Sequence, residues 1–320
     1  MVEYDTGCKI IGTGHYVPDK ILTNEDLARM VDTSDEWIST RTGIKERHIM
    51  EDGETRTGMS VRAAKAALED AGVLPEEIDY LLCATVHGDY ITPSLACCVQ
   101  KELGLRCPAI DINAACAGFL YALDIAQCVI RSKRNVGKIL VIATEGMSRL
   151  TDWSDRSTCV LFGDGSGAAV VARSGAECLL SFVEHAQGNW EVLNIDYGEN
   201  GKPRLRMNGG EVFKFAVNSA CRDIAEAMEA AGITEKGQID HVILHQANQR
   251  ITNAVVGRLG IPEERYMSTI HKYGNTSSSG CAIALDELNR GGKIKKDEII
   301  AFAAFGGGLI SAAAILRWAK

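Results

Sequence analysis

The sequence has little proline and no cysteine pair with the spacing of a zinc or redox motif. Its 320 residues include 6 Pro against 32 Gly, which indicates tight internal turns rather than Pro-rich linkers. None of the 11 Cys forms a Cys-x-x-Cys pair, so zinc-ribbon and thioredoxin-type motifs are excluded. Most of these cysteines lie in apolar runs, which fits free thiols in a reducing compartment better than a disulfide framework.

The chain also lacks an excess of positive charge and a secretory signal. Its 34 Lys and Arg stand against 42 Asp and Glu, a net charge of −8, so nucleic acid is not expected as its main partner. Residues 1–14 show no charged region followed by a long apolar stretch, and we expect a cytoplasmic protein. With 46% hydrophobic and 24% charged residues, the composition is that of a globular protein.

One apolar segment is long enough to be considered as a membrane span. Residues 299–316 are eighteen residues without a charge. Three consecutive glycines, at 306–308, would weaken a helix in the middle of this segment. The sequence therefore predicts two buried strands, Ile299–Phe305 and Leu309–Leu316, joined by a glycine turn, and no membrane association.

The chain contains an internal repeat. Residues 61–73 resemble residues 221–233 at an offset of 160, and both windows have helical spacing and end near glycine. Asn113–Ala126 then matches Asn275–Leu288 at an offset of 162. Phe162–Gly165 echoes Phe305–Gly308 at an offset of 143, which predicts nineteen extra residues in the first half, around 131–158.

The three windows follow one another in the same order, so the protein is expected to consist of two duplicated α/β halves. Each half alternates strands and helices and ends in a strand pair with a glycine turn. That order predicts a mostly parallel sheet with one antiparallel excursion, covered by helices.

Cys116 is the candidate nucleophile. It lies between a predicted strand, 108–112, and a predicted helix, Phe119–Ile130, and small residues flank it. This arrangement resembles a nucleophile elbow. Amides at a helix N-terminus lower a thiol pKa and can hold an oxyanion, so we expect an activated thiol. The duplicated half has Ser278 at this position.

His245 and Asn275 are the candidate partners of the cysteine. His245 directly follows the predicted strand 241–244, where α/β proteins place functional groups. Asn275 precedes a Ser-rich helix start, for which a helix-capping role is the alternative. The order Cys, His, Asn also matches papain-like cysteine hydrolases, a distant alternative because Cys116 lies mid-chain between alanines.

Several longer motifs occur in one order along the whole chain. They are TSDEWISTRTGIKERH (33–48), DINAACAGFLYAL (111–123), FGDGSGAAV (162–170), HQANQRI (245–251), and GNTSSS (274–279) followed by AFGGGLISAAA (304–314). Together they resemble β-ketoacyl-acyl carrier protein synthase III of the thiolase superfamily. The resemblance implies a five-layer α-β-α-β-α thiolase-like fold, with one half at 1–173 carrying the cysteine and the other at 174–320 carrying His and Asn.

The resemblance also implies an acyltransferase that initiates bacterial type II fatty acid synthesis. A short acyl-CoA, with acetyl-CoA expected, acylates the enzyme, and malonyl-acyl carrier protein then condenses with loss of carbon dioxide to give 3-oxoacyl-acyl carrier protein. No metal or cofactor is implied, because the coenzyme A thioester and the carrier protein's phosphopantetheine are substrates. A secondary-metabolite ketosynthase or acyltransferase on the same fold is the alternative.

The resemblance assigns roles to individual residues. Cys116 is the acylated nucleophile, and His245 and Asn275 form the decarboxylation pair, which suits a neutral imidazole N–H and an amide as donors to an enolate. The backbone N–H groups of Cys116 and Gly307 form the other oxyanion hole, and this would explain why the turn at 306–308 lacks side chains.

The remaining implied roles concern binding. The residues implied for coenzyme A are Trp37, Arg41, Arg156, Gly209, Phe213 and Asn248. Gly210 stands where relatives often place a polar side chain, so it can offer only backbone contacts. Lys214 and Arg250 are implied to meet the acidic carrier protein. The family is homodimeric, and Thr92, the residue before Pro93-Ser94, is implied to close the partner's acyl pocket.

Overall fold

Two β-sheets form the framework of the protein. The computed structural model describes residues 7–198, 201 and 203–320. The first sheet has the order β1-β7-β6-β4-β5, with bounds Gly7–Tyr16, Asp164–Ser174, Lys138–Gly146, Tyr80–Ala84 and Ala109–Ile112. The second has the order β8-β13-β12-β11, with bounds Leu179–Ala186, Ile310–Arg317, Ile299–Gly306 and His241–Leu244.

The two sheets repeat the same pairing pattern. In the first, β4 is parallel to β5 and β6, whereas β7 is antiparallel to β6 and β1. In the second, β11 is parallel to β12, and β13 is antiparallel to β12 and β8. The counterpart of β5 is reduced to a parallel bridge between Val242 and Tyr266. The predicted duplication is therefore confirmed. The prediction of mostly parallel sheets with one antiparallel excursion is wrong, because two of the four pairings in the first sheet and two of the three in the second are antiparallel. The additional antiparallel pairings come from β1 beside β7 and from β8 beside β13.

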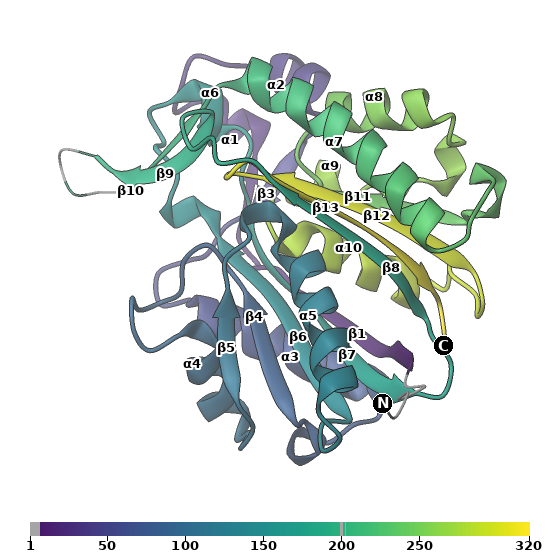
Figure 1. Ribbon diagram of the computed structural model, residues 1–320. Coiled ribbons are helices and arrows are strands. Elements are labelled where there is room, and N and C mark those ends of the chain that lie inside the picture. The colour runs from purple at the N-terminus through teal and green to yellow at the C-terminus, as the bar shows by residue number, and fades with distance from the viewer. Residues whose placement is uncertain (1–6, 199–200, 202) are drawn as a thin grey trace.

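Helices form three layers around the sheets (Figure 1). The outer face of the first sheet is covered by α3 (Arg56–Ala71) and α4 (Leu95–Leu103). The outer face of the second is covered by α7 (Gly209–Ala230) and α8 (Gln249–Leu259). Between the sheets lie α5 (Gly118–Ser132) and α10 (Ser279–Arg290), which contact both. The expected five-layer thiolase fold is confirmed.

The middle layer explains the most apolar helix of the chain. The window Ala115–Ser132 is long and apolar enough to cross a membrane by length and composition, and half of it is buried inside the fold. Its buried face includes Phe119, Leu120 and Leu123 in the core shared by the two sheets. The other apolar segment, 299–316, forms strands β12 and β13 as predicted.

The remaining elements pack around a separate hydrophobic cluster. They are β2 (Ile21–Thr23), α1 (Asn24–Ala28), α2 (Asp35–Thr42), β3 (Glu46–His48), α6 (Arg156–Cys159), β9 (Leu193–Tyr197), β10 (Pro203–Met207) and α9 (Ile270–Tyr273). Their cluster includes Leu27, Ile38, Leu161 and Leu205. The hairpin β9–β10 was not predicted from the sequence, although it contributes to the candidate site.

One part of the repeat prediction is wrong. Phe162–Gly165 runs into the start of β7, whereas Phe305–Gly308 covers the end of β12 and the following turn. Strand register instead equates Asp164 with Ile310, because these residues pair with Gly146 and Gly306. The extra residues of the first half lie in the connection 147–163, compared with 307–309 in the second. The division at 173 and 174 falls at the end of β7 and stays a prediction.

Candidate active site

A single cavity of about 810 Å³ collects most of the predicted site residues. Both halves of the chain and the hairpin β9–β10 contribute to its wall. The predicted residues that line it are Cys116, Gly209, Phe213, Lys214, His245, Asn248, Arg250, Asn275 and Gly307. Residues from the ends of β5, β11 and β12 thus meet at one place, as the carboxyl ends of strands do in α/β proteins.

The backbone around Cys116 has the sharp turn predicted for a nucleophile. Cys116 lies in a single 3₁₀ turn, Ala115–Ala117, between β5 and α5. Ala115 adopts a positive φ of 45°, a conformation that non-glycine residues rarely take. The matching residue of the other half, Ser277, has a φ of 52°. Both halves therefore keep the same strained turn, and only the first places a thiol after it.

The expectation of an acidic thiol is wrong for the free protein. Burial raises the pKa of the Cys116 thiol to about 12, and the nearby Glu145 acts in the same direction. A helix N-terminus contributes about 0.3–1 kcal/mol, whereas one pKa unit corresponds to about 1.4 kcal/mol. Desolvation therefore outweighs the helix, and the resting cysteine is a neutral thiol.

His245 is held at the end of β11 as predicted. Its backbone N–H donates to the Ala303 carbonyl at 2.8 Å, and its ring meets the edge of Phe305 at a centroid distance of 5.1 Å. The side chain is buried, and burial lowers its pKa to about 3. Nδ1 has no hydrogen-bond partner among the described residues. The imidazole is therefore neutral at physiological pH and can act as a donor or acceptor without charge.

Asn275 lies in the turn before α10 rather than at its N-cap. Its side-chain oxygen accepts from the Ser277 N–H at 2.9 Å, and its own N–H donates to the Leu161 carbonyl at 2.8 Å. Ser278 occupies the N-cap position. The capping alternative for Asn275 is therefore wrong, and the side-chain NH₂ is the part of the amide left to serve a ligand.

The glycine turn after β12 packs directly on the nucleophile. A Cβ on Gly306 would lie 2.7 Å from the backbone nitrogen of Cys116, whereas one on Gly307 would lie 3.0 Å from the Leu193 carbonyl oxygen. Gly306 is thus the position with the tightest contact on the cysteine. The lack of side chains in the turn at 306–308 was linked to the Gly307 N–H, whereas the steric contact with Cys116 falls on Gly306.

Sequence reasoning also missed a buried carboxylate behind the cysteine. Glu145 is fully buried at the end of β6, and burial raises its pKa to about 7. Its Oε1 accepts from Ser278 Oγ at 2.7 Å and from Ser277 Oγ at 3.2 Å. Ser277 Oγ in turn lies 3.3 Å from Cys116 Sγ. The sequence signal was a lone acid at the end of an otherwise apolar strand.

Trp37, Arg41 and Arg156 come together outside the cavity wall. The guanidinium carbons of Arg41 and Arg156 lie 5.3 Å and 5.0 Å from the centre of the Trp37 ring. Arg156 also donates to the Asp32 carbonyl at 2.8 Å. The three side chains, which come from α2 and α6, form a single cationic and aromatic cluster.

The polar residues of the cavity wall are partly engaged in local contacts. Asn248 Oδ1 accepts from the Arg250 N–H at 2.8 Å and so caps α8. Lys214 pairs with Glu211 at 2.9 Å on the exposed first turns of α7. Gly210 also lines the cavity, and Thr92 is exposed and does not line the cavity of its own chain.

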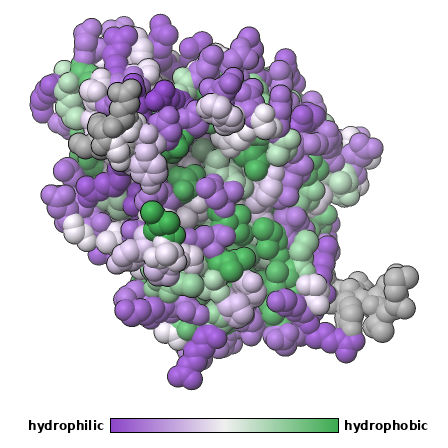
Figure 2. All heavy atoms as spheres, turned by 60° about the vertical axis from the view of Figure 1, so that its left-hand side comes forward, coloured by the Kyte–Doolittle hydropathy of each residue, from purple (hydrophilic) through white to green (hydrophobic). Residues whose placement is uncertain are grey.

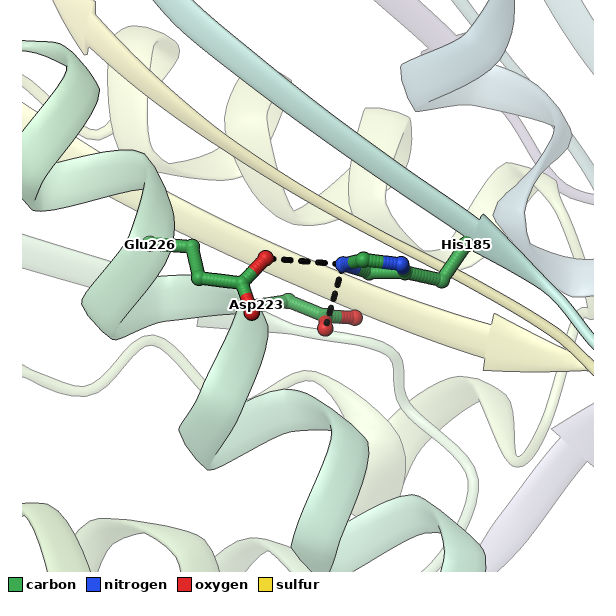
Figure 3. A group of neighbouring side chains, drawn as sticks. All are labelled: His185, Asp223 and Glu226. Carbon is green, nitrogen blue, oxygen red and sulfur yellow. Dashed lines mark hydrogen bonds and ion pairs between the residues drawn. The ribbon is translucent and has the colours of Figure 1, made fainter.

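Within the described residues, one group of three side chains, His185, Asp223 and Glu226, has the spacing of a metal site (Figure 3). His185 Nε2 lies 2.8 Å from Glu226 and 3.7 Å from Asp223. However, Arg222 already places a cation 2.7 Å from Asp223 Oδ1, and none of these residues lines the cavity. The group is adequately described as an ion network, and the absence of a metal from the reaction stays a prediction.

Comparisons with known proteins agree on one family. The family model described as 3-oxoacyl-[acyl-carrier-protein (ACP)] synthase III matches residues 110–188, and the model for its C-terminal part matches residues 228–318. A relative from Aquifex aeolicus, named β-ketoacyl-[acyl-carrier-protein] synthase III, is 48% identical over 98% of this chain and 100% of its own. One of the same name from Xanthomonas euvesicatoria is 42% identical over 97% and 98%.

Solved structures give the same result. The crystal structure of the Aquifex aeolicus enzyme superposes with a TM-score of 0.93 over 98% of this chain and 100% of that one, at 48% identity. The priming β-ketosynthase of the R1128 polyketide pathway has a TM-score of 0.94 over 98% and 97%, at 38% identity. The cysteine hydrolase alternative is thereby replaced. The protein is an acyltransferase-type ketosynthase, and the chain belongs to the β-ketoacyl-[acyl-carrier-protein] synthase III family.

Proposed function

We propose that this chain catalyses the decarboxylative condensation of a short acyl-CoA, with acetyl-CoA expected, and malonyl-acyl carrier protein. The observation that carries the proposal is the opening of Cys116, His245 and Asn275 into one cavity in a chain of this family. A thiol suits the first half-reaction, because acyl transfer between thioesters is close to neutral in energy. The products are 3-oxoacyl-acyl carrier protein, coenzyme A and carbon dioxide, and the step initiates fatty acid synthesis.

Cys116 and the backbone around it carry out the acyl transfer. The Cys116 sulfur attacks the thioester carbonyl, and the N–H groups of Cys116 and Gly307 stabilise the oxyanion that forms. Gly307 lines the cavity directly after β12, next to Gly306, which packs on the turn that holds the thiol. The cavity wall is largely apolar and includes Leu193, Leu205 and Phe305, which suits a short hydrocarbon chain.

His245 and Asn275 carry out the malonyl half-reaction. Loss of carbon dioxide leaves an enolate, which needs hydrogen-bond donors rather than a metal. The neutral imidazole of His245 donates through Nε2–H, because burial keeps its pKa at about 3. The NH₂ of Asn275 is the second donor, since its oxygen is engaged with Ser277.

The substrates enter past the cationic cluster and the first turn of α7. The Trp37 indole stacks on adenine, and Arg41 and Arg156 bind phosphates. Gly209, Phe213 and Asn248 contact the pantetheine arm on its way to Cys116. Lys214 and Arg250 bind the acidic carrier protein; their favourable charge is reduced by the Lys214–Glu211 pair.

We further propose that the protein is a homodimer formed through β5. This strand is the edge of its sheet, and Ile110 on it is 42% exposed. Nearby, Ile91 is 94% exposed next to Thr92, the residue assigned to the partner's acyl pocket. Figure 2, in which the side of α4 and β5 faces forward, shows hydrophobic side chains gathered on this face. The cytoplasmic location stays a prediction.

A primer panel tests the proposed function directly. Acetyl-, butyryl-, isobutyryl- and octanoyl-CoA are each supplied with malonyl-acyl carrier protein, and carbon dioxide release and product mass are followed. We expect release that depends on both substrates and is lost in Cys116→Ser. Turnover that needs no carrier protein, or acylation of Cys116→Ser, would contradict the proposal.

A second candidate is priming of a secondary-metabolite pathway. It is supported by the match to the R1128 priming β-ketosynthase at 38% identity. The same panel separates the two candidates when it is run with carrier proteins of both kinds. Preference for a polyketide carrier protein would favour the second candidate, whereas preference for the fatty acid carrier protein would favour the first.

A further inference from the structure

A chain of hydroxyl contacts leads from the nucleophile to a buried carboxylate. Ser277 Oγ donates to Glu145 Oε1 at 3.2 Å and lies 3.3 Å from Cys116 Sγ. When Glu145 is a carboxylate, the single Ser277 proton is directed toward it, and the Cys116 thiol is then the donor in the other contact. Ser277 and Glu145 are completely or almost completely buried. The contacts therefore run in one direction, from S–H through O–H to the carboxylate.

We propose that Glu145 accepts, through the Ser277 hydroxyl, the proton that Cys116 loses on acylation, and returns it to the sulfur when the condensed product leaves. This inference rests on the proposed function for the identity of the acyl donor. Ser277 touches the reacting sulfur and is a catalytic residue in this scheme. Glu145 does not contact the sulfur; it accepts and returns the proton through Ser277 and is a positioning residue.

The steps balance in both half-reactions. In acylation, the sulfur–carbonyl bond forms, the thiol proton moves to Ser277 and the Ser277 proton moves to Glu145. The coenzyme A thiolate leaves and takes a proton from water. In condensation, carbon dioxide leaves the malonyl group, its carbanion attacks the acyl carbonyl, and the sulfur–carbon bond breaks. The Cys116 thiolate then recovers the proton from Glu145. Glu145 thus supplies the one proton that this half-reaction consumes.

Glu145 is a better acceptor for this proton than His245. Burial brings the pKa of Glu145 to about 7 and that of His245 to about 3, so transfer from the thiol is less uphill to the carboxylate. Glu145 also has the hydroxyl path to the sulfur, whereas no hydrogen bond joins His245 to Cys116 among the described contacts. His245 thus remains available as a neutral donor for the enolate.

Few other titratable groups face this path. Arg56 on α3 stabilises the carboxylate form of Glu145, and its guanidinium donates to the Gly146 carbonyl at 3.1 Å. Asp89 holds the start of α3 through the Arg56 N–H at 2.9 Å. His87 lies in the same segment as Val86, whose N–H donates to Glu145 at 3.2 Å. Cys281 of α10 is the remaining thiol that interacts with Cys116, and burial raises its pKa to about 12.

The chain offers a matched pair of variants. Ser277 and Ser278 both donate to Glu145 Oε1, but only Ser277 has a contact with Cys116 Sγ. Ser277→Ala is compatible with the backbone, because the equivalent Ala115 adopts the same positive φ in the other half. Ser277→Ala therefore breaks the path, whereas Ser278→Ala removes a support of Glu145 and leaves the path in place.

The experiment measures two rates on the full chain between pH 5 and 9. The first is alkylation of Cys116 by iodoacetamide, located by peptide mass, which needs no substrate. The second is acylation by acetyl-CoA. Both rates of the wild type should rise with pH through about 7, as Glu145 becomes a carboxylate. Because a general base contributes about 10²–10⁴-fold, Glu145→Gln and Ser277→Ala should each lower both rates by at least about 10²-fold and lose this midpoint.

The control variant Ser278→Ala distinguishes loss of the proton path from loss of a hydrogen bond that only stabilises Glu145. Ser278→Ala should keep the maximal rate within about threefold and move the midpoint to higher pH, because the Ser278 hydrogen bond lowers the Glu145 pKa. Equal losses in Ser277→Ala and Ser278→Ala, or an unchanged profile in Glu145→Gln, would overturn the proposal. If Glu145→Gln does not fold, the serine pair decides. A protein that alkylates as expected but accepts no acyl-CoA would contradict the proposed function and leave the path standing.

Discussion

Replacing Gly306 by alanine should damage the nucleophile without touching a polar group. The new Cβ would lie 2.7 Å from the Cys116 nitrogen, 3.0 Å from the Ala115 Cβ and 3.2 Å from the Cys116 Cβ. Restoring an ordinary separation of 3.4 Å from that nitrogen requires a shift of about 0.7 Å. All three contacts are with atoms whose positions the backbone turn fixes, so a side-chain rotation cannot relieve the strain.

The expected size of the effect follows from this shift. A misplacement of about 1 Å can cost about 10²-fold in rate, so we expect acylation of Gly306→Ala to fall by roughly 10–100-fold. Overpacking a core typically costs about 1–3 kcal/mol, which should lower the melting temperature by a few degrees. The assay is the initial rate of acetyl transfer from acetyl-CoA, followed by intact mass, together with a thermal melt.

Gly237→Ala is the matched control for this prediction. Gly237 lies in an exposed 3₁₀ turn, Lys236–Gln238, and a Cβ there would meet nothing within 4 Å. Its acylation rate and melting temperature should equal those of the wild type. If Gly306→Ala acylates within about twofold of Gly237→Ala and melts at the same temperature, the contact with the Cys116 backbone does not constrain the nucleophile.

Three further predictions concern other parts of the site. His245→Ala and Asn275→Ala should still accept acetyl from acetyl-CoA but lose about 10²–10³-fold in carbon dioxide release, and failure at acylation alone would reverse this division of labour. Trp37→Ala should raise the KM for acetyl-CoA with little change in kcat, so an unchanged KM would remove the indole from the binding site. Burial lowers the pKa of His245 from 6.5 to about 3, so between these values the unfolded chain binds a proton that the folded chain does not. The wild type therefore loses stability as the pH falls below 6.5, whereas His245→Ala lacks this group and does not. The melting temperature of His245→Ala minus that of the wild type should therefore be higher at pH 4.5 than at pH 7.

Much of the fold could be predicted because the sequence repeats itself. The matching windows at 61–73 and 221–233 cover the last turns of α3 and α7 and the residues that directly follow them, at equivalent places in the two halves. Periodicity gave β11 its observed bounds, His241–Leu244. The third window was misaligned because three consecutive glycines fill the end of β12 and the start of the following turn, and only strand register distinguishes Gly306 from its neighbours. The hairpin β9–β10 has no counterpart in the repeat, so the same argument could not find it.

The candidate site was predicted less completely than the fold. Motifs pointed to Cys116 and His245, because His245 directly follows β11 and Cys116 lies between β5 and α5. They could not find Glu145, since its contact with Ser277 joins residues 132 positions apart. They also gave the wrong direction for the Cys116 pKa, because a sequence shows the neighbouring helix but does not show how strongly its surroundings desolvate the half-buried thiol.

That burial has a consequence for how the two half-reactions share one cavity. A thiol with a pKa near 12 is unreactive at rest and needs a base, whereas an imidazole with a pKa near 3 stays neutral. If His245 took the thiol proton, its imidazolium would be a buried cation with no described partner at Nδ1. Glu145 takes a proton at lower cost, because burial favours its neutral form. The same desolvation therefore opposes His245 as the base for acylation and suits it as a neutral donor in decarboxylation.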